Sequence, residues 1–258
     1  MLKMNQLTLI KYNPWIVTFK AIKAPRLRLF CFPFAGGNAL TYKDWGDYLP
    51  EDVEVCCIQL PGRGNRLLEK PISNLPNLLD ALQEAFLSFI DDVPFVFFGH
   101  SMGALIAFEF TRHLEKRHGV RPVCLFVSAH RAPHLPRKSS TFYHTLPDNE
   151  LLERVKSLNG TPDWFFEEQE LVQLSLPMIK ADLEICECYV YERGPSLKIP
   201  IIAFGGTRDK EVSEESILEW EKITNSSFQM FLLPGNHFFL NSSQDRLLSE
   251  IYKYIRTI

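Results

Sequence analysis

The chain has 258 residues, of which 46% are hydrophobic and 23% are charged. Such a composition is typical of a globular protein and excludes a disordered or fibrous one. A net charge of -3 at pH 7 leaves no excess of basic residues for binding phosphates, so we do not expect a nucleic-acid-binding protein.

Short apolar runs alternate with segments of helical spacing along the chain. Six of the runs are predicted to be strands, at residues 27–32, 53–58, 95–98, 123–127, 199–204 and 228–233. Four other segments are predicted to be helices, at residues 77–90, 103–118, 213–224 and 244–255. Strands and helices in alternation predict an α/β fold with a mostly parallel, doubly wound sheet. Uninterrupted apolar strands fit this prediction, because helices cover both faces of such a sheet.

Residues 131–198 interrupt the alternation, because they are too many for an ordinary connection between two strands. Their sequence predicts helices, and the side chain of Asp148 is expected to cap the first of them. We interpret the segment as a helical lid inserted over the carboxyl edge of the sheet. No repeat or linker indicates a second folding unit, so residues 1–258 are predicted to form a single domain.

The most informative motif is Gly99-His100-Ser101-Met102-Gly103. It follows directly after one predicted strand and leads directly into a predicted helix. A serine at such a turn needs a strained backbone, and the flanking glycines let neighbouring chain pass while the hydroxyl stays exposed. The N-terminus of the following helix also favours negative charge there. We therefore predict an α/β-hydrolase fold with Ser101 as nucleophile, the alternative being a tight turn without a chemical role.

A serine hydroxyl is a weak nucleophile, so it needs a base, and the base needs an orienting acid. His237 is the candidate base, because it lies between the last predicted strand and the last predicted helix, at the same sheet edge as the serine. Asp209 is the candidate acid, because it follows the preceding strand in the chain. Its alternative role is that of a turn or cap residue. Asp182 is then the reserve acid and Glu211 a weaker one.

Acyl transfer also needs hydrogen-bond donors for a tetrahedral oxyanion. The loop after the first predicted strand carries Gly36 and Gly37, which free its backbone. The backbone amides of Ala35 and Met102 are therefore the candidates for an oxyanion hole. A glycine-rich phosphate loop is the alternative, but this loop completes neither the dinucleotide-binding pattern nor the P-loop pattern.

Several longer segments, in order along nearly the whole chain, resemble the type II thioesterases that accompany nonribosomal peptide and polyketide synthases. The matching segments are LFCFPFAGG, CCIQLPGRGNR, FFGHSMGALIAFE, SAHRAP, LPMIKADLEICECYVY, IIAFGGTRD and GNHFFL, and the single residue Trp15 matches near the start of the chain. The resemblance implies that Ser101, Asp209 and His237 form a catalytic triad. It also implies that an acyl or peptidyl carrier protein delivers an acyl thioester on its phosphopantetheine arm, and that the enzyme clears stalled or misprimed acyl groups. Asn236 departs from the family, since many members carry glycine there.

Two further groups of residues are candidates for contacts with substrate or partner. Hydrophobic residues of the predicted lid are expected either to line an acyl channel or to pack onto the sheet, namely Trp164, Phe165, Phe166, Leu176 and Met178. Arg63 and Arg66 are hypothesised to bind an acidic carrier protein or a phosphate. The alternative for Arg63 is a pair within the fold.

Cysteine usage and hydropathy bear on compartment and cofactors. Most of the 6 cysteines lie in apolar runs, as small hydrophobic residues of a cytoplasmic protein do. They complete no zinc-binding set, so we expect no metal, and no cofactor apart from the phosphopantetheine of the substrate. The sequence predicts neither a secretory signal nor a membrane span. We expect a monomer.

Three alternative functions share these residues. A carboxylesterase or lipase would use the same triad, and an acyltransferase would differ only in the nucleophile that finally accepts the acyl group. The third alternative is an inactive hydrolase fold that binds synthase domains, which a complete set of triad residues disfavours.

Overall fold

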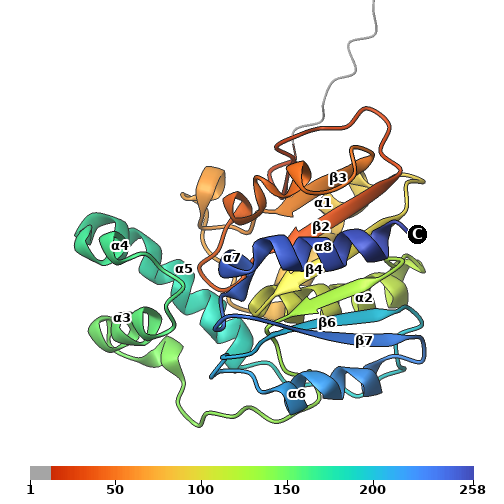
Figure 1. Cartoon of the computed structure of the whole chain (residues 1–258). Coiled ribbons are helices and arrows are strands. Elements are labelled where there is room, and N and C mark those ends of the chain that lie inside the picture. Colours follow the sequence, from red (N-terminus) through yellow and green to blue (C-terminus); the bar gives the residue numbers. More distant parts are fainter. Residues whose placement is uncertain (1–12) are drawn as a thin grey trace, which may run out of the picture.

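The computed structural model describes residues 13–258, so residues 1–12 of the expected domain lie outside the described residues. The described chain forms one sheet in the order β1-β3-β2-β4-β5-β6-β7 (Figure 1). All neighbouring strands are parallel except β1, which runs antiparallel to β3. The strands are Ile16–Val17 (β1), Leu27–Phe32 (β2), Val53–Ile58 (β3), Phe95–His100 (β4), Leu125–Ser128 (β5), Ile201–Gly206 (β6) and Phe228–Leu233 (β7).

Helices cover both faces of this sheet, which explains why its strands are apolar throughout. Successive side chains of a strand point to opposite faces. In β2, Phe30 and Phe32 accordingly pack in one cluster with the helices at residues 75–89 and 102–118, whereas Leu29 and Cys31 pack in the other cluster with the helix at residues 244–255. The helices outside the insertion are Leu75–Phe89 (α1), Met102–His118 (α2), Glu214–Leu218 (α6), Phe239–Ser242 (α7) and Gln244–Ile255 (α8).

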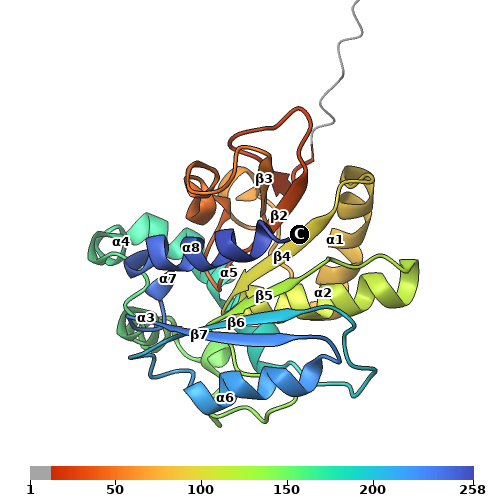
Figure 2. The ribbon, with the colours of Figure 1, turned by 45° about the vertical axis from the view of Figure 1, so that its right-hand side comes forward.

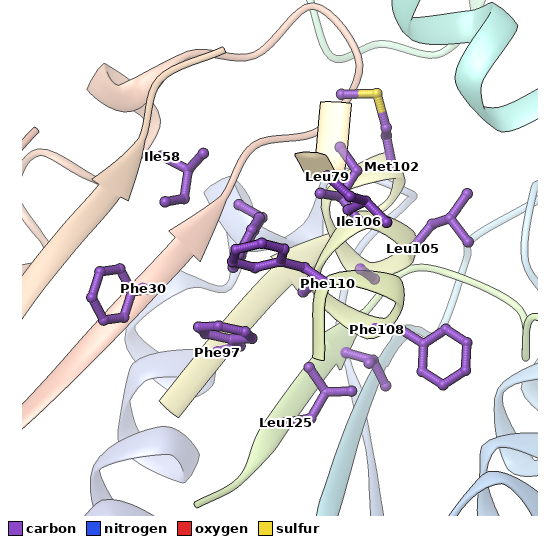
Figure 3. Packing of buried hydrophobic residues seen from close by; sticks show 14 of the residues in the cluster. Phe30, Ile58, Leu79, Phe97, Met102, Leu105, Ile106, Phe108, Phe110 and Leu125 are labelled. Carbon is purple, nitrogen blue, oxygen red and sulfur yellow. The ribbon is translucent and has the colours of Figure 1, made fainter. Parts of the chain in front are cut away.

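The cluster under α1 and α2 supports the helix that starts at the serine motif. Its aromatic side chains interlock, and the rings of Phe97 from β4 and Phe110 from α2 stack with centroids 5.9 Å apart (Figure 3). Met102, Leu105 and Ile106 of α2 are all at most 1% exposed in the same cluster. The first turns of α2 are therefore held firmly against the sheet.

The predicted mostly parallel, doubly wound sheet is confirmed, and differences from the prediction are local. The antiparallel strand β1 was not expected, because two residues are too few to show a period. The predicted helix at residues 213–224 is divided into α6 and the 3₁₀ segment Glu219–Ile223. Within residues 13–258, no helix is both long and apolar enough to cross a membrane.

Three helices lie between β5 and β6, in the segment predicted as a lid: Asp148–Ser157 (α3), Asp163–Glu167 (α4) and Gln169–Glu187 (α5). In both views α3 and α4 lie beyond one end of the sheet (Figures 1 and 2). The prediction that Asp148 caps α3 is wrong. Pro147 is the cap residue, and the Asp148 carboxylate instead binds the Lys180 ammonium of α5 at 2.6 Å. Asp148 thus connects α3 to α5.

Candidate active site

Ser101 lies at a sharp turn between β4 and α2. Its backbone has φ 53° and ψ -119°, a conformation that a non-glycine residue rarely adopts. Strain of this kind costs on the order of 1–3 kcal/mol and is concentrated at functional sites. Glycine is required on the helix side of the turn, because a Cβ on Gly103 would lie 2.1 Å from the carbonyl oxygen of Phe32. The predicted nucleophile elbow is therefore present in the geometry of the backbone.

The structure brings together the three residues predicted as a triad. The Nε2 atom of His237 lies 3.0 Å from Oγ of Ser101, and its Nδ1 atom lies 2.9 Å from Oδ2 of Asp209. The side chains of His237 and Asp209 are 10% and 0% exposed. The serine hydroxyl thus faces an imidazole whose far nitrogen is held by a buried carboxylate.

Asp209 is oriented by its own loop at the end of β6. Its Oδ1 atom accepts hydrogen bonds from the backbone amides of Glu211 and Val212, at 2.8 and 3.2 Å, which leaves Oδ2 for His237. The histidine loop packs closely on this strand end, because a Cβ on Gly206 would lie 2.5 Å from the carbonyl oxygen of Asn236. Asn236 also accepts the amide of Phe238 on its side-chain oxygen at 2.9 Å. The asparagine side chain at position 236, where many family members carry glycine, therefore forms a hydrogen bond within the histidine loop.

His100, inside the serine motif, has a position that the sequence did not reveal. Its ring is fully buried, with Nε2 3.0 Å from the carbonyl oxygen of His237 and Nδ1 2.9 Å from Oγ of Ser128. Burial, with a smaller contribution from the nearby His237, lowers the pKa of His100 well below its ordinary value. His100 is therefore neutral, and it connects the ends of β4 and β5 to the loop of the candidate base. In the sequence, the position of His100 beside Ser101 was the only feature that could have indicated this role.

The candidate oxyanion donors lie where the loop after β2 crosses the start of α2. The close approach of Phe32 to Gly103 places this loop over the helix N-terminus, and Ala35 follows three residues later. Within residues 13–258, the backbone amides of Ala35 and Met102 have no acceptor on the protein. Met102 is the first residue of α2, and unpaired amides at a helix N-terminus attract negative charge. Both amides are thus available to a developing oxyanion.

The reserve acids occupy other sites. The carboxylate of Asp182 binds the guanidinium of Arg63 and the amide of Gly36, whereas that of Glu211 binds the guanidinium of Arg154. The geometry therefore leaves Asp209 as the partner of His237.

The hypothesis that two arginines contact a carrier protein or a phosphate is wrong. Arg63 and Arg66 are only 4% and 5% exposed, so their guanidinium groups are not available to a partner. Arg63 forms the pair within the fold that was its alternative. Arg66 binds Glu69 at 2.6 Å and lies 3.9 Å over the ring of Trp15. Both arginines hold the loop after β3 in place.

The candidate substrate-channel residues lie on the inserted helices in different surroundings. Met178 is 7% exposed inside the apolar cluster of the insertion, and Phe165 packs against the same cluster. Leu176 is also buried there. Trp164, in contrast, is 58% exposed on α4. A lining role for these side chains remains a prediction.

Comparisons with known proteins agree with this geometry. Residues 27–255 match the family of the Thioesterase domain. The chain is 39% identical to the gramicidin S biosynthesis protein GrsT of Aneurinibacillus migulanus, covering 95% of each chain. It is 34% identical in sequence to the type II thioesterase BorB from the borrelidin biosynthetic cluster. The two structures superpose with a TM-score of 0.84 over 93% of this chain and 96% of that one.

One relative carries a name that denotes another reaction. The linear gramicidin dehydrogenase LgrE of Brevibacillus parabrevis is 41% identical, over 95% of this chain and 94% of its own. The present sequence completes no G-x-G-x-x-G motif, and its family match and the Ser-His-Asp geometry are those of a hydrolase. The chain belongs to the thioesterase family, as a type II thioesterase of nonribosomal peptide and polyketide synthase systems.

Proposed function

We propose that this thioesterase hydrolyses acyl thioesters on the phosphopantetheine arm of carrier proteins, with Ser101 as nucleophile, His237 as base and Asp209 as orienting acid. The observation that carries the proposal is the continuous hydrogen-bonded series from the Ser101 hydroxyl through the imidazole to the buried carboxylate. It lies at the carboxyl edge of a parallel sheet, where catalytic residues of open α/β folds gather.

In the proposed acylation step, Oγ of Ser101 attacks the thioester carbonyl and its proton moves to Nε2 of His237. Asp209 accepts a hydrogen bond from the Nδ1–H group, so it selects the required tautomer and stabilises the imidazolium that forms. The carbonyl electrons move to the oxygen, and the amides of Ala35 and Met102 stabilise the resulting oxyanion. When this intermediate collapses, the C–S bond breaks, the thiolate leaves and takes the proton from Nε2 of His237, and an acyl-serine remains.

Deacylation repeats these steps with water. His237 removes a proton from the water, which attacks the acyl-serine, and Ser101 recovers its proton as it leaves. The leaving group of the first step is a thiolate, which needs protonation less than an amine does. We propose that the reaction uses no cofactor beyond the phosphopantetheine that the substrate carries.

The biological role that we propose is removal of stalled or misprimed acyl groups from carrier proteins in the cytoplasm. Two observations support it: kinship with proteins of these pathways, and free, mostly buried cysteines that suit a reducing compartment. The inserted helices lie between β5 and β6, and we propose that they act as a lid that covers the bound acyl chain. We further propose that the enzyme works as a monomer.

The test compares the wild-type protein with Ser101→Ala on three substrates: an acyl group on a holo carrier protein, the same acyl group on a small thioester, and its oxygen ester. Released free acid is measured by mass spectrometry. We expect hydrolysis that depends on Ser101, with the carrier-bound thioester preferred. A preference for the oxygen ester would instead indicate a carboxylesterase.

Two further outcomes would contradict the proposal. Transfer of the acyl group to an added alcohol, amine or thiol in place of water would identify an acyltransferase. Absence of hydrolysis, together with failure of Ser101 to react with a fluorophosphonate probe, would identify a binding module without catalysis. The Ser101→Ala protein serves as the control for background hydrolysis in every arm.

A further inference from the structure

A buried ion pair lies next to the candidate oxyanion loop. The two terminal guanidinium nitrogens of Arg63 bind the carboxylate of Asp182, Nη1 to Oδ2 at 2.6 Å and Nη2 to Oδ1 at 2.7 Å. The two side chains are 4% and 1% exposed. Arg63 lies in the loop after β3, whereas Asp182 comes from α5 of the insertion. The pair therefore joins the inserted helices to the sheet.

The same two side chains hold the glycine loop after β2. Oδ2 of Asp182 accepts a hydrogen bond from the backbone amide of Gly36 at 2.8 Å. Nη1 of Arg63 donates to the carbonyl oxygen of Gly37 at 3.2 Å. In addition, the amide of Gly37 donates to the carbonyl oxygen of Phe34 at 2.8 Å, which closes a turn with Ala35 inside it. Three hydrogen bonds thus restrain the segment from Phe34 to Gly37.

These restraints act on the peptide adjacent to a candidate oxyanion donor. The amide of Gly36 belongs to the peptide that follows Ala35, and a peptide unit is planar. Fixing this N–H direction fixes the plane on one side of Ala35, while the turn fixes the other side. The N–H of Ala35, which has no acceptor of its own within residues 13–258, is thereby directed independently of substrate.

The stability of the fold does not account for an ionic pair at this position. Exchange of a buried salt bridge for well-packed apolar residues is often neutral or stabilising, because the desolvation of both charges is avoided. An apolar pair can fill the space but can neither accept the N–H of Gly36 nor donate to Gly37. These two hydrogen bonds are what the charged pair supplies.

We infer that Asp182, fixed by Arg63, is a positioning residue that sets the Ala35 amide in the oxyanion hole. The inference rests on the proposed function, because it assumes that an oxyanion forms beside Ser101. Asp182 would not contact the substrate; it acts through the backbone of Gly36. Because Asp182 belongs to α5, the inserted helices contribute directly to the geometry of the catalytic loop.

The test uses Asp182→Leu, which removes the acceptor of the Gly36 amide, and the double variant Arg63→Met/Asp182→Leu. The control is Asp148→Asn, which removes a carboxylate from an exposed ion pair of the same insertion. We measure kcat and KM on a small acyl thioester, and the affinity for an alkyl trifluoromethyl ketone. Oγ of Ser101 adds to this ketone, its proton moves to His237, and the carbonyl oxygen becomes an oxyanion in the same hole. The affinity for a thioether analogue of the substrate, which lacks the carbonyl group and cannot react, reports on binding in the ground state.

We expect kcat and ketone affinity to fall together in both variants, by roughly a hundredfold, the usual effect of losing one oxyanion donor. KM and thioether binding should stay within about threefold of wild type, because the lost interaction forms only in the transition state. The double variant should melt near the wild-type temperature and still remain slow. Asp148→Asn should match wild type in every assay.

A folded double variant with wild-type kcat and ketone affinity would overturn the inference, because the pair would then serve packing alone. The same conclusion would follow if the single Asp182 variant lost both stability and kcat, and the double variant regained both. Failure of the proposed function is distinguishable from both results. In that case the wild-type protein itself would show no hydrolysis above Ser101→Ala.

Discussion

The imidazole of His100 donates a hydrogen bond to the backbone carbonyl of His237, with Nε2 and the oxygen 3.0 Å apart. A carbonyl only accepts, so Nε2 carries the proton, and Nδ1 of this neutral ring accepts from the hydroxyl of Ser128. The residue beside the candidate nucleophile therefore fixes the backbone of the candidate base, 137 positions away in the chain. This relationship makes His100 a test of how far catalysis depends on the placement of His237.

Replacement of His100 by leucine should impair both stability and turnover. Leucine fills the site but leaves the Ser128 hydroxyl and the His237 carbonyl buried without partners, at a cost of about 1–3 kcal/mol each. We expect kcat for thioester hydrolysis to fall by at least about tenfold, with a smaller change in KM, because the base loses its anchor. Urea unfolding and steady-state kinetics measure the two effects separately.

Two variants control this experiment. His100→Gln keeps one donor and one acceptor and should recover part of the activity. His118→Ala removes an exposed histidine from the far end of α2 and should behave as wild type. If His100→Leu were destabilised but kept the wild-type kcat per folded molecule, the ring would stabilise the fold without positioning the base.

Replacement of Asp209 by asparagine should nearly abolish hydrolysis without unfolding the protein. Asparagine can keep the hydrogen bonds from the loop amides on Oδ1, but its amino group faces Nδ1 of His237 and favours the wrong tautomer. A comparable change in a serine protease lowers kcat by about 10⁴-fold, and we expect a loss of that order in kcat.

The neighbouring carboxylate offers a matched control for Asp209. Glu211 lies two residues after Asp209, and its carboxylate binds the guanidinium of Arg154. Glu211→Gln removes this negative charge and leaves Asp209 unchanged. Its kcat should stay within about twofold of wild type, as for most surface substitutions. Equal losses in Asp209→Asn and Glu211→Gln would contradict the assignment of the acid.

How far the sequence predicts this site depends on the distance over which each signal acts. The GHSMG turn and the strands are local patterns. Because the carboxyl ends of parallel strands lie at one edge of the sheet, the loops that carry Asp209 and His237 are predicted to meet Ser101 there. The pair of Arg63 and Asp182 spans 119 residues, and no local pattern joins its members. Asp182 therefore resembled a spare catalytic acid and Arg63 a binding residue. Only the packing of α5 against the loop after β3 explains both.

The stability of the protein should decrease as the pH falls from neutrality. Burial, followed by the nearby Arg131 charge, lowers the pKa of His130 from 6.5 to about 4. Between these two values the unfolded chain binds a proton that the folded protein does not. The contribution of His130 is complete above about pH 6.5 and is lost as the pH falls toward 4. His100 contributes with the same sign, since burial lowers its pKa as well.

This dependence can be measured through His130→Gln, which cannot titrate. Between about pH 7 and about pH 5, the free energy of unfolding should fall by roughly 1–2 kcal/mol less in the variant than in wild type. Urea denaturation at the two pH values gives both numbers, with His118→Ala as the exposed control. An identical pH dependence in wild type and His130→Gln would show that His130 has the same pKa in the folded and unfolded states.

Thiol reactivity offers a test of the buried core that is independent of catalysis. Of the 6 free cysteines, Cys188 is exposed, whereas Cys31, Cys56, Cys57 and Cys124 are buried. Burial raises the pKa of each buried thiol, to about 12 for Cys57. Because the thiolate is the reactive form, a disulfide reagent should rapidly modify only the exposed thiol of Cys188 in the folded protein.

The Cys188→Ser variant should lose this rapid phase, and Cys186→Ser should retain it. In denaturant, wild type should react at all 6 thiols, since unfolding exposes each of them. Because Cys186 on α5 is half-buried, the decisive protein is the double variant Cys186→Ser/Cys188→Ser, which keeps only the four buried thiols. Its rapid modification would mean that the sheet opens under native conditions, contrary to the close packing of β2 and β3. With that phase removed, Cys188→Ser also becomes the background in which thiol release from a thioester substrate reports on the reaction alone.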